Sequence, residues 1–119
     1  MDHSPGFLKL VNETLPRVRE VSVAETRARM KKGTRVFDVR EDLEYSASHV
    51  KGAQHLGKGV IERDIEKSVP DPSTEIILYC GGGFRSALAA DTLQKMGYTN
   101  VWSMAGGWRA WNAAGGPVE

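Results

Sequence analysis

The chain has 119 residues, which is enough for one domain with its own hydrophobic core and too few for two. Its 16 basic and 15 acidic residues give a formal net charge of +1, whereas a nucleic-acid-binding protein normally concentrates positive charge on one face. The single cysteine excludes an internal disulfide, and no cluster of cysteine and histidine indicates a metal site. No apolar run approaches the roughly 20 residues that span a bilayer, and the first residues lack the features of a signal peptide, so we expect a cytoplasmic protein.

An amphipathic helix is predicted over residues 4–15. Ser4 is suited to cap this helix, and Pro16 limits its extent. Such a helix packs either across the domain or onto another chain, and we favour the first alternative. We therefore expect a helical extension at 1–17 on or beside a domain at 18–119.

Short apolar runs alternate with amphipathic segments along the rest of the chain, which predicts an α/β domain with a parallel sheet. Ser22 and Glu25 fit a capping box at the start of one helix. A later short helix is expected to turn Val60, Ile61 and Ile65 inward. Strands are predicted at 18–21, 35–39, 76–79 and 100–104, and helices at 23–32, at 87–96 and up to about 113.

One stretch places the only cysteine between a strand and a helix. Cys80 ends the apolar run, and it is followed by Gly81, Gly82, Gly83, Phe84, Arg85 and Ser86. Backbone amides at a helix N-terminus are unpaired and carry partial positive charge, and glycines allow the chain to fold such amides around one point. We interpret Cys80 as a nucleophilic thiolate in an anion-binding loop, with Arg85 as a cation for an incoming oxyanion.

A structural interpretation of the same residues is available. A lone cysteine after an apolar strand is more often a small buried hydrophobic residue, and a glycine triplet can be only a flexible turn. The combination of thiol, glycines, arginine and helix start within seven residues favours the functional interpretation, because a structural core needs no such combination.

The segment from Cys80 to Arg85, a C-x-x-x-x-R loop, resembles the active-site loop of the rhodanese family of sulfurtransferases. Three other segments are similar to signatures of that family. They are Asp-Val-Arg-Glu at 38–41, a His-x-x-Gly-Ala stretch at 49–53 that leads into a short strand, and Gly-Gly-Trp at 106–108. The resemblance extends from about residue 18 to the C-terminus. It implies a five-stranded, mostly parallel sheet with helices on both faces.

The resemblance also implies a reaction, the transfer of sulfane sulfur in two half-reactions. The Cys80 thiolate would take the outer sulfur of thiosulfate or a persulfide donor, and cyanide or a thiol, small or on a protein, would then accept it. The amides of 81–85 would hold the persulfide, with Arg85 orienting the donor. No metal or organic cofactor is required, and we expect no nucleic-acid or membrane partner.

Residues outside the loop are candidates for the periphery of the site. We favour structural roles for two of them, with Asp38 capping the following loop and Arg40 pairing with an acid such as Glu44. Lys58 and Arg63 either bring positive charge to the pocket mouth or lie on a solvated face. His49 is an acid–base group or, more commonly, a hydrogen-bonded strut. The peripheral candidates are Asp38, Arg40, Arg63 and Trp108.

Three other functions fit parts of the sequence. Cysteine phosphatases and arsenate reductases on the same fold have one more residue between cysteine and arginine, so phosphate should fit this loop poorly. Non-catalytic rhodanese-like binding modules typically lack the cysteine that this chain retains. Nucleotide binding is disfavoured because the glycines do not complete G-x-G-x-x-G and no Walker lysine follows.

Overall fold

Five short parallel strands form the centre of the structure, a computed structural model that describes residues 3–119. Each neighbouring pair of strands is parallel, so the predicted α/β fold is confirmed and its sheet is parallel throughout. The sheet order is β1-β5-β4-β2-β3. The strands are β1 (Arg19–Val21), β2 (Arg35–Asp38), β3 (Gln54–His55), β4 (Ile76–Tyr79) and β5 (Val101–Met104).

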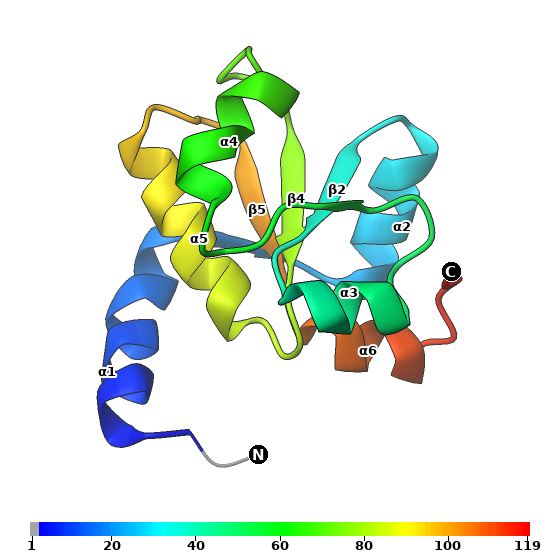
Figure 1. The fold of residues 1–119 in the computed structure, drawn as a ribbon, viewed down its shortest axis with the longest axis horizontal. Coiled ribbons are helices and arrows are strands. Elements are labelled where there is room, and N and C mark those ends of the chain that lie inside the picture. The colour runs from blue at the N-terminus through cyan, green and yellow to red at the C-terminus, as the bar shows by residue number, and fades with distance from the viewer. Residues whose placement is uncertain (1–2) are drawn as a thin grey trace.

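Helices lie on both faces of this sheet, as Figure 1 shows. One face packs against α4 and α5, and the other against α2 and α6. The short helix α3 lies beside β3 at one edge. The helices are α1 (Pro5–Thr14), α2 (Val23–Lys31), α3 (Asp42–Ala47), α4 (Ile61–Ser68), α5 (Phe84–Lys95) and α6 (Gly107–Ala113).

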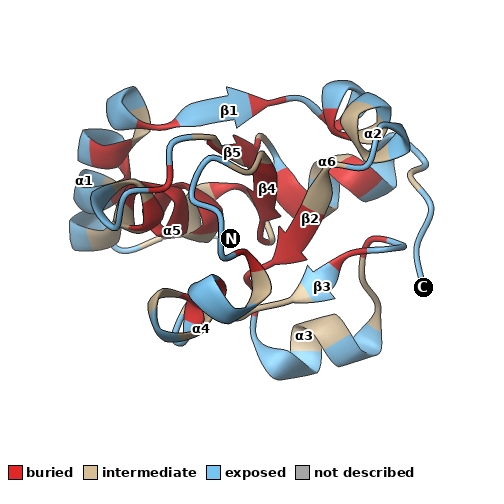
Figure 2. Ribbon diagram, turned by 90° about the horizontal axis from the view of Figure 1, so that it is seen from above, coloured by how far each residue is buried: buried red, intermediate tan, exposed pale blue. Residues whose placement is uncertain are grey.

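The central strand β4 is buried on both of its faces (Figure 2). Ile76 and Leu78 belong to the core on the α5 side, whereas Ile77 and Tyr79 belong to the core on the α6 side. Alternation of side chains along a strand therefore places the next residue, Cys80, on the α5 side. A fully apolar strand of this kind is typical of the middle of a parallel sheet.

A side-chain cap is present at the start of α2, whereas Ser4 at the start of α1 makes no side-chain cap hydrogen bond. The Ser22 hydroxyl accepts a hydrogen bond from the Glu25 amide at 3.0 Å, as expected for a cap. Helix α5 begins at Phe84, three residues before the predicted start. Helix α4 buries Ile61 and Ile65 completely, but the expected inward position of Val60 is wrong, because Val60 precedes the helix and is exposed.

Helix α1 packs along α5. The guanidinium of Arg17, which follows α1, pairs with Asp91 of α5 at 3.0 Å, and Gln94 donates a hydrogen bond to the Arg17 carbonyl. Val11 and Thr14 are the buried residues of α1. The division of the chain after residue 17 stays a prediction. None of the helices in residues 3–119 is long and apolar enough to cross a membrane.

Candidate active site

Cys80 lies directly after the carboxyl end of β4, and its sulfur faces the first turn of α5. The Gly83 amide donates to Sγ at 3.1 Å, and the Ser86 amide donates at 3.4 Å. The Ser86 hydroxyl lies 3.5 Å from the sulfur and 2.8 Å from the hydroxyl of Ser103 on β5. Two backbone amides and a hydroxyl therefore surround the sulfur, an arrangement that stabilises negative charge on it.

The start of α6 holds the other side of this loop. The Trp108 amide donates to the Cys80 carbonyl at 2.7 Å, and the Arg109 amide donates to the Gly81 carbonyl at 3.1 Å. These bonds turn the loop carbonyls toward α6. Gly83 adopts φ 101°, a left-handed conformation that favours glycine, and so directs its amide at the sulfur.

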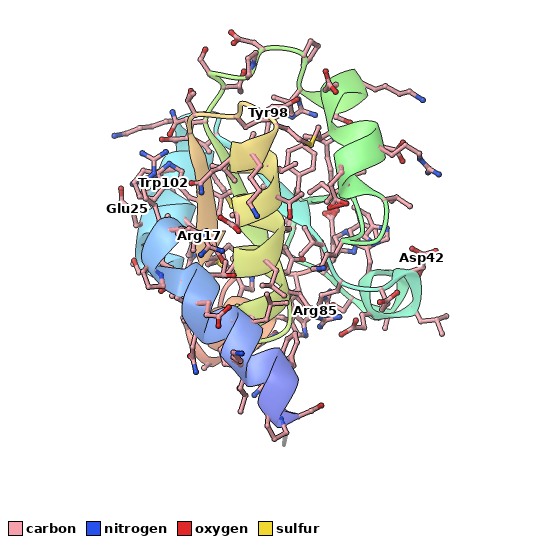
Figure 3. The ribbon with its side chains drawn as sticks, turned by 90° about the vertical axis from the view of Figure 1, so that its left-hand side faces the viewer. Arg17, Glu25, Asp42, Arg85, Tyr98 and Trp102 are labelled. Carbon is pink, nitrogen blue, oxygen red and sulfur yellow. The ribbon has the colours of Figure 1, made fainter. Side chains whose placement is uncertain are left out.

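Arg85 is held by an acid from a different part of the chain. Its Nη1 and Nη2 donate to Oε1 and Oε2 of Glu44 at 2.8 and 3.2 Å. The hydrogen bond from Arg85 lowers the pKa of Glu44. In Figure 3, Arg85 lies at the start of α5, on the side toward α3, which carries Glu44. The expected pair between Arg40 and Glu44 is therefore wrong.

Arg40 pairs instead with Asp38, and both side chains are buried. The Arg40 Nη2 lies 2.8 Å from the Asp38 carboxylate, which also accepts the Arg40 amide at 2.9 Å, so the expected loop cap is present. Tyr79 donates its hydroxyl proton to the same carboxylate at 2.7 Å. Burial and this hydrogen bond raise the pKa of Tyr79. This network lies behind the site, because none of its three residues lines the pocket at Cys80.

A pocket of about 700 Å³ opens beside the cysteine. It is lined by His3, Phe7, Glu44, Cys80, Gly81, Gly82, Phe84, Arg85, Trp108 and Arg109. Of the predicted residues, Gly83 and Ser86 contact the sulfur from behind. Arg63 does not line the pocket; it is exposed and pairs with Asp64.

Four pocket residues were missed by the sequence analysis: His3, Phe7, Glu44 and Arg109. Their positions depend on how α1, α3 and α6 pack around the loop, and no local pattern encodes that packing. The Gly-Gly-Trp segment directly precedes Arg109 and was the one signal in the sequence that could have pointed to it.

His49 makes the hydrogen bond expected of a strut, and His55 is held in the same way. His49 is hydrogen-bonded to the Tyr45 carbonyl and His55 to the Arg40 carbonyl, and both rings stack on Tyr45. Among residues 3–119, no group of three or more metal-ligating side chains could hold a metal ion.

Comparison with known proteins identifies the family of this chain. Residues 22–114 match the Rhodanese-like domain family. The thiosulfate sulfurtransferase GlpE of Haemophilus influenzae is 32% identical over 101 residues, which cover 85% of this chain and 94% of that protein. GlpE of Pseudoalteromonas translucida is 34% identical over 98 residues, covering 81% of this chain and 90% of that protein.

A solved structure is similar over the whole length. It is a protein of unknown function from Rhodopseudomonas palustris, described as a possible tyrosine phosphatase, with a TM-score of 0.84 and 30% identity. The similarity covers 100% of this chain and 98% of that one. Because the family match spans most of the sequence and includes the Cys80 loop, the chain belongs to the rhodanese-like domain family.

Proposed function

We propose that this protein is a sulfurtransferase that moves sulfane sulfur from thiosulfate or a persulfide donor to cyanide or a thiol. The observation that carries the proposal is the environment of Cys80. Its sulfur receives two backbone amides from the start of α5 and borders a pocket large enough for a small organic ligand. Amides in this position would stabilise both the attacking thiolate and the persulfide that it forms.

In the first half-reaction, the Cys80 thiolate attacks the outer sulfur of thiosulfate. A new S–S bond forms to Cys80, the S–S bond within thiosulfate breaks, and sulfite leaves with the electron pair of that bond. The enzyme then carries an anionic persulfide. In the second half-reaction, cyanide attacks the outer sulfur, thiocyanate leaves, and the thiolate returns. Charge balances in both steps, and the kinetics should be ping-pong.

A phosphatase is the second candidate, because the Rhodopseudomonas palustris protein is described as a possible tyrosine phosphatase. The loop here has only four residues between Cys80 and Arg85. A shorter loop leaves fewer amides to surround a tetrahedral phosphate, and the terminal nitrogens of Arg85 are already paired with Glu44. Both features favour sulfur transfer over phosphate hydrolysis.

The test is intact mass spectrometry of the protein after treatment with thiosulfate, followed by cyanide. Wild type should gain the mass of one sulfur atom and lose it on addition of cyanide, with thiocyanate released. Cys80→Ser is the matched control and should gain no mass. An aryl phosphate, assayed in parallel, should not be hydrolysed.

Two other results would contradict the sulfurtransferase proposal. Phosphate release that depends on Cys80, without sulfur transfer, would assign the phosphatase activity. If neither thiosulfate nor an organic persulfide loads wild type with sulfur, the sulfurtransferase proposal is wrong and a binding module becomes the better hypothesis.

A further inference from the structure

Two guanidinium groups flank the glycines that follow Cys80. A methyl group placed on Gly81 would lie 3.1 Å from Nη2 of Arg85, and one placed on Gly82 would lie 3.2 Å from Nη2 of Arg109. Both arginines line the pocket that Cys80 borders. The two glycines next to Cys80 therefore lie against two cations, one from α5 and one from α6.

The two cations differ in how their charge is compensated. Arg85 forms a two-pronged ion pair with Glu44, which neutralises it and occupies both of its terminal nitrogens. The Arg109 guanidinium makes no ion pair or side-chain hydrogen bond with any residue in the described range, 3–119. Of the two arginines that line the pocket, Arg109 is thus the one whose charge no described residue compensates, and it is available to an entering anion.

The backbone of Arg109 is fixed relative to the nucleophile. Its amide donates to the Gly81 carbonyl at 3.1 Å, and the preceding amide of Trp108 donates to the Cys80 carbonyl at 2.7 Å. Arg109 also lies in the first turn of α6, which contains no acidic residue. A cation is unfavourable there because the helix dipole is positive at that end. Violations of a local rule of this kind are expected at functional sites.

We propose that Arg109, rather than Arg85, binds the anionic end of the sulfur donor. This proposal rests on the proposed function. When the Cys80 thiolate attacks the outer sulfur of thiosulfate, negative charge accumulates on the departing sulfite. A guanidinium offers two parallel N–H donors to two oxygens of that group, and the interaction strengthens as sulfite forms. Arg85, held by Glu44, then serves to fix the loop.

The donor class follows from the same pocket. The aromatic side chains of Phe7, Phe84 and Trp108 line the wall with Arg109, and about 700 Å³ exceeds what thiosulfate alone needs. A sulfonate or carboxylate bound by Arg109 would leave an apolar body against these rings. The geometry therefore suits organic sulfane donors that carry one anionic group, in addition to thiosulfate.

The test compares steady-state sulfur transfer to cyanide for wild type, Arg109→Gln, Arg109→Met and Arg109→Lys. Thiosulfate, a dianion, and methanethiosulfonate, a monoanion with the same reacting sulfur, serve as donors. Arg27→Gln is the matched control, because Arg27 lies on α2, outside the Cys80 pocket. We expect the Gln and Met variants to raise the KM for thiosulfate by about tenfold or more, and that for methanethiosulfonate by less.

Further outcomes separate this proposal from the function on which it rests. Arg109→Lys should recover part of the affinity for thiosulfate, and Arg27→Gln should match wild type. An unchanged KM in Arg109→Gln and Arg109→Met, or equal losses for both donors, would overturn the assignment of Arg109. If wild type itself transfers no sulfur from any donor, the sulfurtransferase function has failed instead. Thermal unfolding of each variant identifies any loss that is due to misfolding.

Discussion

The side chain of Glu44 determines how much positive charge Arg85 can offer to the pocket. The Glu44 carboxylate accepts hydrogen bonds from both terminal nitrogens of Arg85 and, at 3.0 Å, from the amide of Glu41. These bonds fix the carboxylate at the start of α3. The pair is partly exposed, with 30% of the Arg85 side chain and 38% of the Glu44 side chain accessible. Solvent therefore screens it, and its contribution to stability should be about 1 kcal/mol or less.

Replacing Glu44 with Gln should free the charge of Arg85 at little cost to the fold. We expect Glu44→Gln to lower the KM for thiosulfate, because a second uncompensated cation then faces the pocket. The pKa of Glu44 is lowered from its usual value of 4.5, so the carboxylate contributes stability above that value and loses it as the pH falls through the lower, folded value.

The free energy of unfolding in urea, measured between about pH 7 and pH 3, checks the expected pH dependence of stability. The difference between wild type and Glu44→Gln should be present at pH 7 and should shrink as the pH falls below the folded pKa of Glu44. Glu20→Gln, at an exposed acid on β1, is the control and should show no such difference. A difference that grows toward low pH would contradict the ion pair.

For single residues, the sequence predicts contacts between neighbours along the chain and misses contacts between residues that are distant in sequence. Cys80, its glycines and the cap residues of α5 are contiguous, so their relationship follows from strand and helix geometry alone. The partner of Arg85 lies 41 residues earlier, and Arg40 was an equally reasonable partner for that acid. Only the packing of α3 against the start of α5 decides between the two arginines.

Among the elements, α1 has a role that extends beyond covering α5. It brings His3 and Phe7 to the pocket, where both rings lie close to Phe84 of the loop that follows Cys80. The ring centroids of Phe7 and Phe84 are 6.2 Å apart, and His3 lies 5.3 Å from the first and 5.1 Å from the second. These separations are typical of aromatic pairs that stabilise one another. The pocket is therefore bounded on one side by a segment outside the family match.

Truncating Phe7 should open that side of the pocket. We expect Phe7→Ala to destabilise the protein by on the order of 1 kcal/mol, because the side chain is only partly buried. The larger effect should be on donors with an apolar body, with the KM for benzenethiosulfonate rising more than the KM for thiosulfate.

Leu10→Ala is the matched control on the same helix. Leu10 is 49% exposed and does not line the pocket, so its removal should change neither KM. Equal effects of Phe7→Ala on both donors would show that α1 does not contact the substrate.

The sequence predicted α1 as an amphipathic helix but could not predict its docking site, because a hydrophobic face specifies burial and not a partner. Helix α3 was not predicted at all. It is six residues long, too short for a helical period to emerge, and it is held by the reciprocal bonds between Glu41 and Glu44.

In the molecule as a whole, one buried polar network joins strands that are distant in sequence. Asp38 at the end of β2 pairs with Arg40 and accepts the hydroxyl of Tyr79 from β4. The same hydroxyl accepts the Val50 amide, and Val50 forms an isolated antiparallel bridge with Val118 of the C-terminal tail. The network thus ties the central sheet, the segment before β3 and the tail into one unit.

The sequence placed Asp38 correctly in a strand and Arg40 directly after it, but did not reveal the depth of their burial. Two charged residues in an Asp-x-Arg pattern look the same on a surface and in a core. The distinction depends on Tyr79 and on the backbone carbonyl of Ser48, which accepts a hydrogen bond from Arg40 at 2.7 Å.

Removing the charge of Asp38 should therefore destabilise the whole protein rather than impair the chemistry. In Asp38→Asn, Arg40 stays buried, with 4% of its side chain accessible, and loses its counter-charge, which typically costs about 3–5 kcal/mol. Asp91→Asn removes the acid of a pair whose arginine is 51% exposed, so its effect should be much smaller. Urea unfolding of both variants measures the contrast, and sulfur loading of Cys80 well below the unfolding midpoint should persist in each. Equal losses of stability would mean that the network around Asp38 is not what holds these strands together.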